Sequence, residues 1–170
     1  SVHLEITVSN NDAALARLRS ALLDRKIKLI ADPDVNKILK NKTSDKTEFL
    51  VYAENLSTDD VTKLMRELSN QYIVGQGTNQ KMVPSPYQKL ALAPNKNDDL
   101  RAVAKVFGVD VDAIDLQKRK NGNVEPARER NSVLVPLAGM AAPSSEVRQF
   151  VNQRSAPQPG KLQVIITIRQ

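Results

Sequence analysis

Several stretches of the chain alternate apolar and polar residues, which is typical of β-strands with one buried face. The clearest of these stretches are Val2–Val8, Phe49–Ala53 and Leu162–Ile168. A different spacing follows the second stretch, where Val61, Leu64, Met65 and Leu68 recur three and four positions apart. This spacing gives a helix one apolar stripe. Ser57, three positions before Asp60, is predicted to cap that helix.

Residues 1–80 predict the order strand, helix, strand, strand, helix, strand. The predicted strands are 2–8, 28–31, 49–53 and 72–74, and the predicted helices are 12–25 and 57–68. This order is that of the ferredoxin-like fold, an antiparallel sheet with two helices on one face. The lysine-rich stretch 35–46, between the second and third predicted strands, is interpreted as a loop with at most one helical turn.

The second half predicts a smaller β-α-α-β unit and a final strand. Its strands are 90–92 and 132–137, with a first helix that begins at Asn97 or Asp98 and ends at Gly108. A second helix is predicted from Asp110 or Asp112. The alternating terminus needs a partner, so we expect it to add to the edge of the first sheet. The predicted organisation is α+β, with a domain at 1–80, a linker at 81–89, the small unit at 90–137, a linker at 138–160 and a terminal strand at 161–170.

The net charge of +6 lies entirely in the second half of the chain. Residues 1–80 carry 11 Lys/Arg and 11 Asp/Glu, while residues 81–170 carry 14 and 8. The basic positions that an anionic partner would contact are Lys118, Arg119, Lys120, Arg128 and Arg130. The other interpretation of this basic patch is a solvated loop, and we favour that interpretation.

Residue usage argues against most catalytic and metal chemistry. The chain has no Cys, which excludes disulfides, thiolate zinc sites and a Cys nucleophile. The single histidine, His3, lies on the polar side of an alternating strand, and we expect it to be a solvated surface residue. Acidic pairs such as Asp59/Asp60 stand where a helix N-terminus favours negative charge. We therefore expect neither an enzyme nor a bound metal or cofactor.

Residues 90–137 resemble a lysin-motif (LysM) module, a β-α-α-β unit that binds N-acetylglucosamine-containing glycans such as peptidoglycan. The matching features are Asp99-Leu100 at a helix start, the run Ala104–Val109, Asn121 and the closing Val133–Pro136. The opening Gly-Asp turn reads Asn97-Asp98, and no Pro-Gly turn precedes the last strand. The resemblance implies glycan binding from the turn and a following loop, through Asn95, Asn97, Asp98, Asp99, Asn121 and Asn123.

A second resemblance, in pattern, is to the extracytoplasmic portions of planctomycete-type membrane-anchored anti-sigma factors. It rests on the opening strand and helix, on the strand and helix within residues 47–68, and on the apolar terminal strand 161–170. It implies a bacterial, non-catalytic interaction or sensory domain in signalling, placed outside the membrane. The chain begins at Ser1, so we expect it to be a segment of a longer or processed protein, whose anchor would lie upstream.

The stretch 100–114 also fits a helix-turn-helix, with Lys118–Lys120 placed for phosphate contacts. Asp110, Asp112 and Asp115 would then face the DNA and repel it. The prediction is therefore a non-catalytic, extracytoplasmic interaction domain that binds a protein or the cell wall. The first alternative is a peptidoglycan binder and the second a DNA-binding protein.

Overall fold

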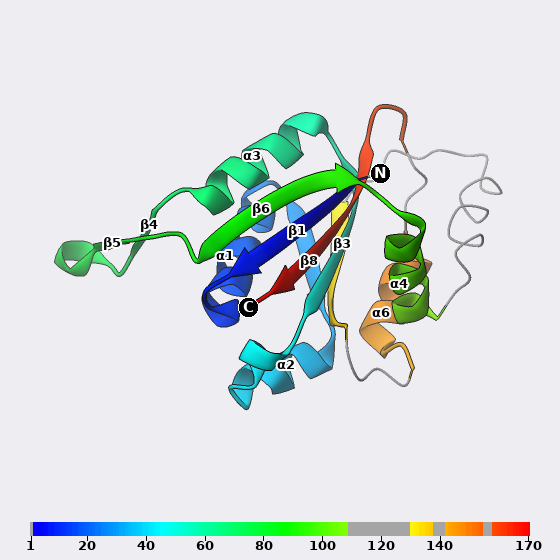
Figure 1. Ribbon diagram of the computed structural model, residues 1–170, viewed down its shortest axis with the longest axis horizontal. Coiled ribbons are helices and arrows are strands. Elements are labelled where there is room, and N and C mark those ends of the chain that lie inside the picture. Colours follow the sequence, from blue (N-terminus) through cyan, green and yellow to red (C-terminus); the bar gives the residue numbers. More distant parts are fainter. Residues whose placement is uncertain (1, 109–129, 138–141, 155–157) are drawn as a thin grey trace.

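The computed structural model describes residues 2–108, 130–137, 142–154 and 158–170. Its centre is a mixed six-stranded sheet with the order β2-β7-β3-β8-β1-β6, and a separate pair, β4-β5, lies outside it (Figure 1). The strands of the large sheet are β1 (Val2–Val8), β2 (Ile27–Ala31), β3 (Phe49–Leu56), β6 (Tyr87–Pro94), β7 (Arg130–Pro136) and β8 (Leu162–Arg169). The α+β prediction is confirmed.

Three helices cover one face of the sheet. They are α1 (Asn11–Asp24), α2 (Pro33–Lys40) and α3 (Thr58–Ser69). The apolar stripe predicted for α3 packs on the sheet: Val61 is 4% exposed, Leu64 and Leu68 are fully buried, and Met65 is half-buried against the same core. The predicted cap is confirmed as a reciprocal capping box, in which Ser57 Oγ accepts from Asp60 N and the Asp60 carboxylate accepts from Ser57 N. These helices and the sheet beneath them form the first core.

The opposite face is covered by α4 (Asn97–Phe107) and α6 (Ser145–Asn152). Their apolar residues pack on the second core, which contains Leu50, Tyr52, Val133, Val135 and Ile165 from the sheet. Strand β3 serves both cores, because Phe49, Val51 and Ala53 face the first and the residues between them face the second. All eight residues of β3 are buried.

The ferredoxin-like expectation is wrong in its strand pairing and in its single layer of helices. Strand β4 (Tyr72–Val74) does not join the large sheet; it pairs with β5 (Lys81–Val83), within the stretch expected to be a linker. The local pattern finds strands but does not choose their partners. The second layer of helices follows from apolar side chains on both faces of β3, β7 and β8, which need cover on both sides.

The C-terminal strand does return to the first strands, but as an interior strand. Strand β8 lies between β3 and β1, parallel to β1 and antiparallel to β3. Its residues Val164, Ile165 and Ile166 are almost fully buried, so both of its faces are covered. A strand that is apolar on both faces suits the middle of a sheet rather than its edge.

The two strands expected to close the β-α-α-β unit are not neighbours. Strands β6 and β7 belong to the same sheet, but β3, β8 and β1 separate them. The paired β-α-α-β arrangement expected for residues 90–137 is therefore not formed. The second helix expected in that unit falls within residues 109–129, outside the described residues.

Two further segments are helical where the sequence favoured loops. Helix α2 begins at Pro33, after Asp32, whose Oδ1 accepts from Asp34 N at 2.8 Å. Its Val35 is buried in the first core, which explains why the lysine-rich stretch folds as a helix. Helix α6 likewise buries Val147 and Phe150, within the stretch expected to be a linker.

Candidate functional site

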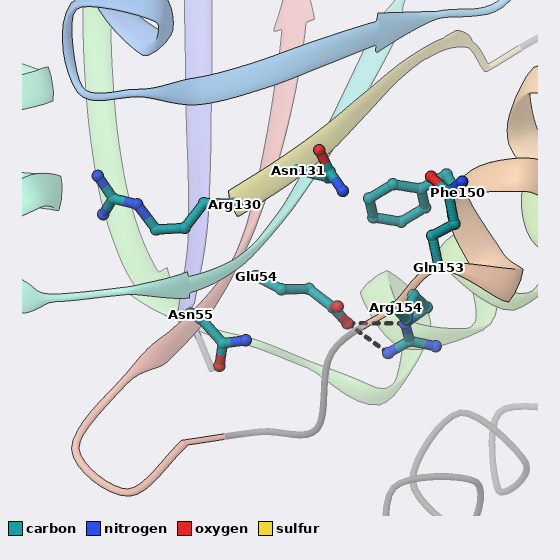
Figure 2. Close-up of a pocket in the computed structure, with 7 residues that line it drawn as sticks. All are labelled: Glu54, Asn55, Arg130, Asn131, Phe150, Gln153 and Arg154. Atoms are coloured by element: carbon teal, nitrogen blue, oxygen red, sulfur yellow. Dashed lines mark hydrogen bonds and ion pairs between the residues drawn. The ribbon is translucent and has the colours of Figure 1, made fainter. Parts of the chain in front are cut away.

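A small polar pocket lies where β3 ends beside the end of α6 (Figure 2). The lining residues are Glu54, Asn55, Arg130, Asn131, Phe150, Gln153 and Arg154. Strand β3 shifts register against β8 between Ala53 and Leu56, and Asn55 has a positive φ of 58°. Such a β-bulge redirects side chains, and here Glu54 reaches Arg154.

Glu54 and Arg154 form a buried ion pair. Arg154 Nη2 lies 2.5 Å from Glu54 Oε1, Arg154 Nε donates to the same oxygen at 2.7 Å, and the side chains are only 8% and 7% exposed. Tyr52 Oη donates to Glu54 at 2.9 Å and accepts from Arg154 at 3.2 Å. Burial alone would lower the pKa of Arg154, but the Glu54 carboxylate and the Tyr52 hydroxyl raise it above its ordinary value. Every charge in this network is therefore compensated.

The size of this pocket decides what it can do. Its volume is about 10 Å³, the room of a single water molecule. Tyr52 also packs edge-on against Phe107 and Phe150, with ring centroids 5.4 and 6.1 Å away. The ion pair thus ties the end of α6 to β3 over the second core. We interpret it as structural.

A larger hollow lies between α1 and α2. It has a volume of about 360 Å³, and its lining residues are Asp12, Leu15, Ala16, Arg19, Leu39 and Leu134. The size is within the range of ligand pockets. Asp12 is held by Ser44, whose Oγ donates to Asp12 Oδ1 at 2.5 Å. Its lining contains no paired carboxylates and no nucleophile with a base beside it, so it has no evident catalytic group.

The β4-β5 pair forms an arm that projects from the body of the molecule (Figure 1). We call residues 72–83 the arm. Among the described residues, three of the five large apolar side chains that stay exposed belong to it: Ile73 at 58%, Val74 at 40% and Met82 at 64%. Ile73 and Met82 are directly opposite each other across the two strands, so they form one apolar face.

The base of the arm is fixed to the body and its tip is shaped by glycine. The Arg17 guanidinium lies 4.6 Å from the centre of the Tyr72 ring and donates to the Glu67 carbonyl, while Ser85 Oγ donates to the Leu68 carbonyl. At the tip, Gly75 has a φ of +94°, and a Cβ there would collide with the backbone of Asn79. The exposed apolar face is therefore held in a defined place.

The residues expected to bind glycan are only partly described. Asn95 follows β6, and Asn97, Asp98 and Asp99 begin α4. Both amide atoms of Asn95 are shielded from solvent without a hydrogen-bond partner. The Asp98 side chain is 89% exposed and 3.5 Å from Arg101. Asn121 and Asn123 lie outside the described residues.

The basic patch is likewise represented by one residue. Lys118, Arg119, Lys120 and Arg128 lie outside the described residues, together with the second helix of the DNA-binding hypothesis. Arg130 is engaged internally, 2.7 Å from the Asp60 carboxylate and donating to the Arg25 carbonyl. Burial alone would raise the pKa of Asp60. The hydrogen bonds from Ser57 and the pairing with Arg130 outweigh this effect, so the pKa of Asp60 lies below its ordinary value.

His3 is half-buried rather than fully solvated, and its Nε2 lies 2.8 Å from Thr167 Oγ1 on β8. Within the described part of the chain, no three His, Cys, Asp or Glu side chains gather where they could hold a metal ion. The same residues contain no helix that is long and apolar enough to cross a membrane.

The arm and the ion pair were both missed at the sequence level. A signal for the arm exists, because Ile73-Val74 and Met82-Val83 flank a turn-forming stretch with Gly75 and Gly77, as in a hairpin. The pairing of Glu54 with Arg154 joins positions 100 residues apart, and no local pattern connects them.

Comparison with family models, with curated proteins and with solved structures gives no match to this chain.

Proposed function

We propose that this chain is a non-catalytic interaction domain that binds a protein partner through the exposed apolar face of the arm. The observation that carries the proposal is the exposure of Ile73 and Met82, opposite each other on a hairpin that projects from the body. Apolar surface gathered in one place on a folded protein is typical of an interaction site. A hairpin of two short strands is only marginally stable by itself. The exposed apolar residues of the arm are therefore not explained by a contribution to the stability of the fold.

The chemistry of the arm indicates the kind of partner. Residues 72–83 contain one charged residue, Lys81, and no acid. The partner surface should therefore be an apolar groove with at most a weak acidic margin. The arm's attachment through Tyr72 and Arg17 limits the conformational entropy lost on binding.

The resemblance to the extracytoplasmic portions of anti-sigma factors supplies a setting for this proposal. In that setting the chain is a sensory or interaction domain of a membrane-anchored bacterial regulator, and the arm receives the signal by binding another extracytoplasmic protein. The anchor would belong to a longer protein.

Photo-cross-linking in the native host tests the proposal. A benzophenone amino acid replaces Met82 in one variant and Leu23 in a control, because Leu23 is 68% exposed and lies on α1. We expect a discrete cross-linked product of this chain with a different protein at position 82 and none at position 23. Equal products at both positions, or none at position 82, would overturn the proposal.

A further inference from the structure

Strand β6 forms an open edge of the large sheet. It pairs antiparallel with β1 on one side, and no other strand among the described residues pairs with its second side (Figure 1). Alternate backbone N–H and C=O groups of β6 therefore lack a strand partner. Such an edge can pair with another extended chain.

The composition of this edge is unusual for a strand left open. Proteins usually protect edges with charges or with Pro. In β6, Lys89 is the only charged residue and Pro94 is the last residue, so the stretch between them carries neither protection. Leu90, Ala91, Leu92 and Ala93 follow Lys89 without interruption. Leu92 is 46% exposed on the face where its neighbour Leu4 is fully buried, so the first core stops short of it.

We propose that β6 pairs antiparallel with β6 of a second copy of this chain, about a two-fold axis at Ala91. This register places Leu90 of each copy opposite Leu92 of the other, on the face of the first core. The exposed Leu92 is thereby covered. Lys89 then faces Ala93, so no like charges are opposed.

Neighbouring registers are less favourable. An axis at Lys89 opposes the two lysines, which is destabilising. An axis at Leu90 places Leu92 opposite Gln88, and an axis at Leu92 places Leu90 opposite Pro94. Only the axis at Ala91 sets a leucine against a leucine at both positions. The self-complementarity of one register favours a second copy over an unrelated segment as the occupant. This inference is independent of the arm, which lies on other strands.

Cysteine cross-linking tests the register, because the chain has no cysteine of its own. Leu90→Cys and Leu92→Cys are purified separately, mixed in equal amounts and mildly oxidised. The proposed register brings position 90 of one copy opposite position 92 of the other, whereas identical positions are about 7–8 Å apart, beyond disulfide reach. We expect the mixture to give several-fold more disulfide-linked dimer than either variant alone. Equal yields in all three samples would overturn the register.

Sedimentation equilibrium tests the association itself. The unmodified chain should shift from monomer to dimer as its concentration rises, and Leu92→Lys should weaken that association at least tenfold, because it places a charge against Leu90 of the partner copy. Leu23→Lys adds the same charge at an exposed position of α1 and should dimerise like the unmodified chain. A chain that stays monomeric, or Leu92→Lys that dimerises normally, contradicts the proposal.

Discussion

The body and the arm of this molecule use the same kinds of residues in opposite ways. In β3, apolar side chains point to both faces and every residue is buried. In the arm, Ile73, Val74 and Met82 are also apolar and also in strands, yet they are exposed. The difference lies in what surrounds each strand: β3 is covered by helices on both sides, whereas the arm meets α1 and α3 only at its base and projects away from the body (Figure 1).

This contrast separates apolar residues that stabilise the fold from apolar residues that stay exposed on its surface. Burial of the apolar residues of the sheet stabilises the folded state. The exposed residues of the arm contribute little to that free energy and remain available for a partner. Substitutions in the two regions should therefore have very different effects.

The largest loss of stability is expected from Phe49→Ala, which removes a fully buried ring from the first core. We expect a decrease of about 3–5 kcal/mol in the free energy of unfolding. Chemical denaturation followed by circular dichroism measures it. A decrease below about 1 kcal/mol would mean that packing in the first core contributes little to the stability of the body.

Breaking the buried ion pair should cost nearly as much. Arg154→Met leaves the Glu54 carboxylate buried without its partner, and we expect a loss of about 3 kcal/mol. The double variant Glu54→Gln/Arg154→Met removes both charges and should recover much of that loss. If the single variant is as stable as the unmodified chain, the pair is not buried as described.

A smaller, pH-dependent effect is expected at Asp60. Its pKa is lowered in the folded chain by Ser57 and Arg130, so its ionised form stabilises the fold above the ordinary Asp pKa, and this contribution is lost as the pH falls through the lowered value. Asp60→Asn should cost about 1–2 kcal/mol at pH 7, from the lost cap and ion pair. The difference between the two proteins should shrink below about pH 4. A difference that is constant with pH would contradict this account.

The smallest effect on stability is expected in the arm. Ile73→Ser should change the free energy of unfolding by less than about 0.5 kcal/mol, because the side chain is already 58% exposed. Thermal and chemical unfolding check this value. A loss comparable to that of Phe49→Ala would show that the arm belongs to the folded core.

Most helices and strands of the body could be predicted from the sequence, but the pairing of the strands could not. Strands such as Val2–Val8 and the capping box at Ser57 are encoded locally, by alternation and by a three-residue spacing, and both are confirmed. The neighbours of β8 and the separation of β4 from the large sheet depend on contacts between distant residues, which periodicity does not record. The same limit explains why the Glu54–Arg154 pair was not predicted. The glycan-binding and phosphate-contacting roles proposed for residues within 118–128 stay predictions.

The central claim is that the arm binds a foreign protein. The most direct test is the yield of the cross-linked product from position 82 in a chain that also carries Ile73→Ser. The account predicts that this yield falls at least tenfold while the unfolding midpoint of the chain is unchanged. An undiminished yield, or a product whose mass is twice that of the chain, would contradict a foreign protein bound at the apolar face of the arm.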